Sequence, residues 1–75
     1  MAILDVRPIL AAGDDPFAEI LAAVAALGPG EVLELIAPLD PVPLYAVLAA
    51  RGFSHVTERL GEGDFRITFR RTDGS

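Results

Sequence analysis

The chain has 75 residues, a formal net charge of −5 and no cysteine. A chain of this length forms one domain, and without a thiol it has neither a disulfide nor thiolate chemistry. Its acidic balance argues against general nucleic-acid binding, and no apolar run is long enough to span a bilayer.

The remaining composition predicts a soluble domain with an unusually apolar surface or core. Apolar residues make up 52% of the chain, which is high for its length, so the core is dense or an apolar surface is shared with a partner. The opening MAILDVR lacks the features of a signal peptide, and we expect a cytoplasmic protein. We expect one domain over residues 1–71 and a disordered tail over residues 72–75.

The first half of the chain predicts a strand followed by a helix. Residues 2–6 form a short apolar run typical of a strand, and we expect residues 7–14 to be a loop. Asp15 and Pro16 predict a helix start, because aspartate accepts from a free backbone N–H and proline there loses no hydrogen bond. Apolar residues follow at helical spacing until Gly28 ends the helix.

A second strand and a second helix follow. Residues 32–37 are apolar on both faces except for Glu34, as in an interior strand. Asp40 and Pro41 repeat the helix-opening signal, and Gly52 predicts the end of this helix.

The last third of the chain predicts a hairpin. Residues 53–60 and 64–70 read as strands joined by a glycine-rich turn, and the last strand alternates between apolar and polar residues. The order is therefore β-α-β-α-β-β. Right-handed crossovers place both helices on one face, so we expect an α/β (α+β) two-layer sandwich with a four-stranded mixed sheet in the order 1-2-4-3. The predicted core is Leu4, Val6, Phe17, Ile20, Leu21, Val24, Leu33, Leu35, Leu44, Val47, Leu48, Val56, Phe65, Ile67 and Phe69.

From residue 3 to residue 71 the chain resembles the TusA/SirA-like superfamily, and more closely its cysteine-less branch, a bacterial and archaeal domain of unknown function. The segments that carry the resemblance are Leu4-Asp5-Val6-Arg7, Pro29-Gly30-Glu31, Asp40-Pro41-Val42-Pro43-Leu44-Tyr45 and Arg51-Gly52-Phe53. In the sulfur-carrier branch a Cys-Pro-x-Pro motif opens the first helix, and here that region reads Asp15-Pro16. The resemblance therefore implies the carrier scaffold without its nucleophile. Many members of the cysteine-less branch hold a histidine where this chain has Leu39, so no metal or haem role follows.

Four residues are candidates for a ligand site. Arg7, Asp15, Asp40 and Tyr45 all lie near the carboxyl ends of the parallel strands, where α/β sheets usually bind ligands. Free N–H groups at the two helix starts favour an anion there, and Arg7 can pair with such a ligand or with a nearby carboxylate. The alternative is that the aspartates only cap helices. We assign no catalytic residue, metal ligand or cofactor, and expect His55, the single histidine, to point away from the helices.

The helix-free face of the sheet is a second candidate surface. By alternation it carries Ile3, Asp5, Val32, Glu34, Ile36, His55, Thr57, Arg59, Arg66, Thr68 and Arg70. Glu34 can pair across strands with Arg66 or Arg70, which is the structural interpretation. The functional interpretation is a docking surface for another protein, a fused or neighbouring domain, or a second copy of the chain. Its candidate residues are Ile3, Val32, Glu34, Arg59, Arg66 and Arg70.

Three functions remain open. The first is a non-catalytic interaction or small-ligand-binding module. The second is a small acid/base enzyme that uses carboxylates at the helix N-termini. Its hydrolytic or proton-transfer site would consist of Asp14, Asp15, Asp40, Tyr45 and Arg7. The third is nucleic-acid binding, since the C-terminal domain of translation initiation factor three has a similar topology, but the acidic balance weighs against it.

Overall fold

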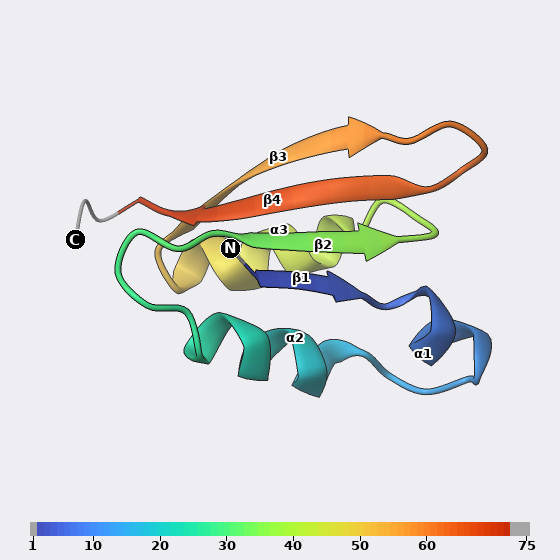
Figure 1. Cartoon of the computed structure of the whole chain (residues 1–75), viewed down its shortest axis with the longest axis horizontal. Coiled ribbons are helices and arrows are strands. Elements are labelled where there is room, and N and C mark those ends of the chain that lie inside the picture. The colour runs from blue at the N-terminus through green and yellow to red at the C-terminus, as the bar shows by residue number, and fades with distance from the viewer. Residues whose placement is uncertain (1, 73–75) are drawn as a thin grey trace.

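The structure is a computed structural model and describes residues 2–72. Its elements are β1 (Ala2–Asp5), α1 (Arg7–Ala11), α2 (Phe17–Ala25), β2 (Leu33–Ala37), α3 (Val42–Ala50), β3 (Phe53–Arg59) and β4 (Phe65–Arg71). One four-stranded sheet has the order β1-β2-β4-β3, which confirms the predicted order (Figure 1). β1 and β2 are parallel, and β4 runs antiparallel to both of its neighbours.

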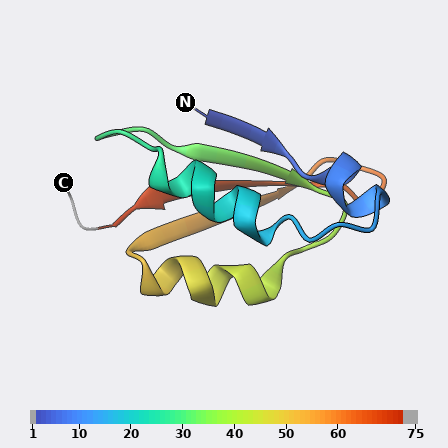
Figure 2. The ribbon, with the colours of Figure 1, turned by 90° about the horizontal axis from the view of Figure 1, so that it is seen from below.

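The molecule has two layers. Figure 2 shows α2 and α3 on the same side of the sheet, and the other face carries no helix. Leu33 and Leu35 of β2 are fully buried toward the helices, whereas Glu34 between them faces the helix-free side and is only half-buried. The two-layer arrangement with both long helices on one face is therefore confirmed.

The core lies between the sheet and the two long helices. Its buried members are Val6, Ile20, Val24, Leu27, Leu33, Leu35, Ala37, Leu44, Leu48, Phe53, Ile67 and Phe69. Most of them were predicted. Phe17 and Val56 were predicted to be buried but are exposed, and the predicted core residues Leu4, Leu21, Val47 and Phe65 are only partly buried. Leu27, Ala37 and Phe53 are buried although they were not predicted.

The expected loop over residues 7–14 is wrong, because α1 occupies its first part. Asp5 is the last residue of β1, and its Oδ1 accepts a hydrogen bond from the backbone N–H of Arg7 at 3.0 Å. Pro8 lies in the first turn of α1, where a missing N–H costs nothing. Gly13, with a φ of 82°, then reverses the chain toward α2.

The predicted face of β3 is also wrong. His55 pairs with Phe69 and Thr57 with Ile67, and both partners are fully buried beneath the helices. Directly paired residues of antiparallel strands share a face. His55 and Thr57 therefore lie on the helix side, and Val56 lies on the helix-free face.

Two physical reasons select this face. Leu60 N–H donates to the Asp64 carbonyl at 2.9 Å, so the hairpin pairs odd-numbered residues of β3 with odd-numbered residues of β4. Phe53 and Val56 lie three positions apart in the strand, so they point to opposite faces and cannot both face the core. Phenylalanine has the larger apolar area, so burying Phe53 is more favourable than burying Val56, and Phe53 is the buried one.

The end of β4 is tied back to the start of β3. Thr72 donates to the Gly52 carbonyl from its backbone N–H at 2.7 Å and from its Oγ1 at 3.0 Å. The disordered tail expected over residues 72–75 is therefore wrong for Thr72. The rest of that tail, residues 73–75, lies outside the described residues.

Candidate functional site

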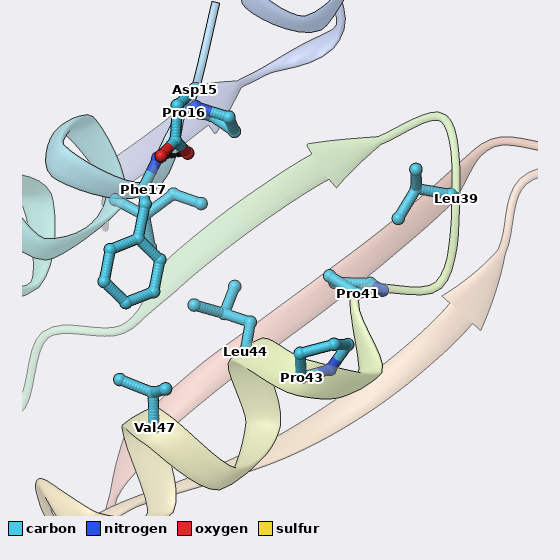
Figure 3. A pocket seen from close by; sticks show the side chains of 9 residues that line it. Asp15, Pro16, Phe17, Leu39, Pro41, Pro43, Leu44 and Val47 are labelled. Carbon is cyan, nitrogen blue, oxygen red and sulfur yellow. Dashed lines mark hydrogen bonds between the residues drawn. The ribbon is translucent and has the colours of Figure 1, made fainter.

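An apolar groove runs between the N-terminal ends of α2 and α3, near the carboxyl ends of β1 and β2. Its volume is about 270 Å³. We call it the α2–α3 groove. It is lined by Asp15, Pro16, Phe17, Ile20, Leu39, Pro41, Pro43, Leu44 and Val47. Figure 3 shows these side chains converging from the start of α2, from the β2–α3 loop and from α3.

Proline at the helix starts makes this end of the molecule apolar. Pro16 precedes α2, while Pro41 precedes α3 and Pro43 lies in its first turn. A proline has no N–H, so pyrrolidine rings replace amides at the groove. Asp15 Oδ1 also accepts from the Phe17 N–H at 2.9 Å. The free N–H groups that would favour an anion are therefore fewer than the sequence suggested.

The outer surface of α3 has no charge. The helix reads VPLYAVLAA, and it buries only Leu44 and Leu48 completely. A soluble helix normally presents charged residues on its outer face. Here Val42 is 59% exposed, and Leu39, just before the helix, is 50% exposed. The groove thus continues into an apolar helix surface.

Tyr45, at the side of α3 that faces β3, is the centre of a polar cluster. Its hydroxyl donates to Asp40 Oδ1 at 2.5 Å and shares a hydrogen bond with Thr57 Oγ1 at 2.6 Å. Its ring stacks on His55, with centroids 3.7 Å apart and planes at 7°. Asp40 and Tyr45, predicted as ligand residues, thus lie together with His55 and Thr57, which sequence reasoning had placed on the opposite face.

The surroundings of Tyr45 favour the protonated phenol. Burial raises the pKa of Tyr45 above its ordinary value, and the hydrogen bond to the Asp40 carboxylate raises it further. The hydrogen bond with Thr57 acts in the opposite direction. A phenol in this state donates hydrogen bonds and is a poor base, so the cluster joins α3 to β3 rather than activating a nucleophile.

Arg7 lies away from the groove. It chelates Asp5 through Nε at 2.9 Å and Nη2 at 2.7 Å, and its Nη1 donates to Asp64 Oδ2 at 2.8 Å. These hydrogen bonds lower the pKa of Asp5 and raise the pKa of Arg7. Arg7 was expected to pair with an anionic ligand or with a nearby carboxylate, and the carboxylates that it contacts are those of Asp5 and Asp64. The four predicted ligand residues therefore lie in three separate places: Arg7 beside Asp5 and Asp64, Asp15 at the groove, and Asp40 with Tyr45.

The helix-free face carries an ion-pair network. Arg66 contacts Glu58 Oε1 at 2.7 Å and Glu34 Oε1 at 3.6 Å, so the expected pairing of Glu34 across strands is confirmed. Arg66 is held by β4, Glu34 by β2 and Glu58 by β3. The charges of this face thus neutralise one another at its middle.

The other predicted interaction residues are divided between the two faces. Ile3 is 68% exposed on the helix-free face, and Arg70 pairs there in register with Ser54. Val32 lies just before β2 and is half-buried. Arg59 was placed on the wrong face, because its guanidinium lies 5.8 Å from the ring centre of Phe65 on the helix side.

Sequence reasoning missed most of the groove. It assigned Phe17 and Val47 to the core and treated Leu39 only as the place of an absent histidine. One signal was available, because the ten residues from Pro41 to Ala50 contain no charge. A surface helix without charge is unusual in a globular protein and is a signal for a candidate interaction surface.

Neither a metal site nor a membrane span is evident in the part of the chain that is described. Across residues 2–72 no three histidine, aspartate or glutamate side chains are grouped so as to hold a metal ion. None of the helices in the same range combines the length and the apolar character needed to cross a bilayer.

The comparisons with known proteins identify a family without a described activity. A family model described as "Uncharacterized conserved protein (DUF2249)" matches residues 3–71. Neither a curated protein nor a solved structure matches the chain.

Proposed function

The chain belongs to the DUF2249 family of uncharacterised conserved proteins, and we propose that it is a non-catalytic binding module. Its ligand is a short segment of a partner protein, which docks in the α2–α3 groove. The observation that carries this proposal is the near absence of charge on the two helices that form the groove. Of the eighteen residues in α2 and α3, nine in each, Glu19 alone is charged.

The size of the groove favours a side chain over a free metabolite. Pockets that enclose small molecules usually span about 300–1,000 Å³ and bury most of the ligand. This groove has about 270 Å³ and is lined almost wholly by apolar side chains. Such a space fits one or two apolar side chains of a peptide, whose backbone stays in water.

Charge at the rim indicates what flanks those apolar side chains. Asp15 lines the groove, and Asp14 and Asp40 are exposed beside it, while none of the lining residues is basic. All cations of the chain are arginines, and none belongs to the groove. Electrostatic complementarity therefore favours a partner segment with a large apolar residue next to lysine or arginine.

The helix-free face is the weaker candidate for this role. Its central charges already pair among Arg66, Glu34 and Glu58, so a partner would have to break or match those pairs. The acid/base alternative also has little support, because Arg7 and the two candidate carboxylates Asp15 and Asp40 do not meet in one cleft.

Selection from a phage-displayed random peptide library tests the proposal. We expect enriched peptides with a leucine, isoleucine, methionine or phenylalanine beside a basic residue. Titration of such a peptide should shift the backbone amide NMR signals of Phe17, Leu39 and Val47. Enrichment of acidic or wholly polar peptides, or signal changes on the helix-free face instead, would contradict the proposal.

Two matched variants locate the site. Leu39→Ser should weaken peptide binding about tenfold, because a half-exposed leucine loses its apolar contact with the ligand. Leu60→Ser is the control, since Leu60 is 42% exposed against 50% for Leu39 but lies at the β3–β4 turn. Asp15→Asn keeps the capping acceptor and removes the charge, so it should weaken basic peptides selectively. Equal loss in Leu60→Ser would show that the site lies elsewhere.

We also propose that the start of α2 is the position at which TusA/SirA-like carriers hold their cysteine. The support is the sheet order with both long helices on one face, together with Asp15-Pro16 where those carriers have Cys-Pro. Asp15 Oδ1 already accepts the Phe17 N–H, and a thiolate at residue 15 would be stabilised by the same donor.

An installed thiol tests this correspondence. In Asp15→Cys the rate of alkylation by iodoacetamide, followed against pH, should give a thiol pKa below the ordinary value of about 8.5. Ala26→Cys, at the other end of α2, is the control and should not show a lowered pKa. Equal pKa values in the two variants would remove the correspondence.

A further inference from the structure

β3 is an outer strand of the sheet with a free side. Within residues 2–72 it pairs with β4 alone, and every residue from Ser54 to Arg59 is exposed. In Figure 1 no described segment lies beyond β3, whose outer side is open along its length. The opposite outer strand, β1, has four residues against seven in β3.

The hydrogen-bond pattern shows which backbone groups of β3 are free. Leu60 N–H donates to the Asp64 carbonyl at 2.9 Å, and Thr72 N–H donates to the Gly52 carbonyl at 2.7 Å. Antiparallel pairing alternates from residue to residue, so the even-numbered residues of β3 bond to β4. The residues whose N–H and C=O groups point outward are Phe53, His55, Thr57 and Arg59.

Most of the devices that protect an edge strand are missing from β3, although it does carry two charged residues, Glu58 and Arg59. Natural edge strands avoid pairing with other chains through proline, lysine, bulges or short length. β3 reads FSHVTER, with neither proline, glycine nor lysine, and its register with β4 has no bulge. Seven regular residues with free outward groups form a template for another strand.

We propose that this edge pairs with β3 of a second copy, so that two molecules form one continuous sheet about a two-fold axis through Val56. The axis is perpendicular to the sheet, which makes the two strands antiparallel and keeps both helix layers on one side. In this register Val56 faces Val56, His55 faces Thr57, Ser54 faces Glu58 and Phe53 faces Arg59 of the second copy. All seven residues of each strand take part, and the outward-pointing groups of the two copies meet as hydrogen-bonded pairs.

The side chains of β3 suit pairing with themselves. Val56 is 69% exposed in the single chain, and on the axis it gains an apolar contact with its own copy. Glu58 lies opposite a serine and Arg59 opposite an aromatic ring, so like charges are kept apart. A register centred on Glu58 would set two carboxylates face to face, which is destabilising. A peptide strand lacks this symmetric match, and the edge therefore fits a second copy best.

Sedimentation equilibrium over a range of concentrations tests the proposal. We expect a reversible dimer of twice the 7.9 kDa chain mass. Val56→Lys should raise the dimer dissociation constant about tenfold, because two ammonium groups then meet at the axis. Val56→Glu should do the same, and an equimolar mixture of the two variants should restore association as a heterodimer.

Ile3→Lys is the matched control. Ile3 is 68% exposed on the same helix-free face, but it lies on β1. We expect this variant to dimerise as the wild type does. Equal loss of the dimer in Ile3→Lys would mean that the sheets stack by their faces, and it would overturn the edge pairing.

Hydrogen exchange identifies the strand directly. The amides of His55 and Thr57 point outward, so their protection should rise with protein concentration in parallel with dimer formation. The amides of Ser54 and Val56 bond to β4 and should stay protected at all concentrations. A wild-type chain that stays monomeric, or concentration-independent exchange at His55 and Thr57, would overturn the proposal.

Discussion

At the scale of single residues, the polar side chains of this protein mostly hold elements together. Tyr45 joins α3 to β3 through Thr57 and joins the β2–α3 loop through Asp40. Arg7 joins β1 to the start of β4 through Asp5 and Asp64. Arg7, Asp40 and Tyr45 were predicted to bind a ligand. Because they are engaged in contacts within the fold, the apolar groove is the better candidate site.

Tyr45 should titrate at a higher pH than a free phenol. Its folded pKa is raised above the ordinary 10.0, so the stabilisation is present below pH 10 and is lost as the pH rises through the folded pKa. The chain has one tyrosine and no tryptophan, so the absorbance of the phenolate follows this group alone. Asp40→Asn should lower the pKa and Thr57→Val should raise it. Opposite shifts would mean that the hydrogen bonds are assigned wrongly.

Removing the phenol should cost a modest amount of stability. Tyr45→Phe keeps the ring stacked on His55 but loses two partly exposed hydrogen bonds. We expect a loss of about 1 kcal/mol in the free energy of unfolding by urea at pH 7. The same variant should also lose the alkaline decline described above. A loss as large as that of a buried leucine would show that the cluster holds the core rather than its edge.

Asp5 should contribute to stability only above acidic pH. Its folded pKa lies below the ordinary 3.8 because Arg7 donates to it, so the stabilisation is present above pH 3.8 and is lost as the pH falls through the lower folded value. In Asp5→Asn the free energy of unfolding should therefore decline less steeply as the pH falls below about 5. The difference in slope should be at most the contribution of about one bound proton. Urea unfolding at several pH values measures this, and an unchanged slope would contradict it.

At the scale of elements, the sequence predicted what periodicity and helix-start signals determine. Proline and aspartate marked both long helices, and alternation in β4 marked the core face. The face of β3 could not be read from its own residues, because Phe53 and Val56 compete for the core. The register across the hairpin turn pairs odd-numbered residues of β3 with odd-numbered residues of β4, and knowing it would have identified the core face of β3. The short α1 carried only a weak signal in Pro8.

The turn from α3 to β3 depends on backbone conformation rather than on space. Gly52 has a φ of 85°, and a Cβ there would meet nothing within 4 Å. Gly52→Ala should therefore cost about 1 kcal/mol through backbone strain alone. Gly52→Asn should cost less, because asparagine tolerates this conformation better. Thermal unfolding of the two variants compares them, and equal losses would point to a steric cause instead.

At the scale of the whole molecule, a small core supports an apolar surface. Among the described residues, twelve form the buried cluster, and the helix layer outside it adds little charge. The sequence indicated this only through its overall apolar content. The sequence could not show where the exposed apolar residues lie, because residues at the groove and residues in the core share the same helical spacing.

The stability of such a molecule should be sensitive to single core deletions. Folded domains have about 0.05–0.15 kcal/mol of stability per residue, which gives roughly 4–11 kcal/mol for 75 residues. Leu35 is fully buried in β2, and Leu35→Ala should cost about 2–5 kcal/mol. We expect this variant to unfold at a markedly lower temperature than the wild type, as circular dichroism would show. Ile67→Val, a smaller deletion on β4, should stay folded.

The strand order has a consequence for synthesis on the ribosome. β4 is the last strand to be translated, yet it lies between β2 and β3 in the sheet. Until residue 71 leaves the exit tunnel, the nascent chain holds β2 and β3 without their shared neighbour. The sheet therefore cannot be completed during synthesis until β4 has emerged. Until then the incomplete sheet is exposed to chaperones and proteases.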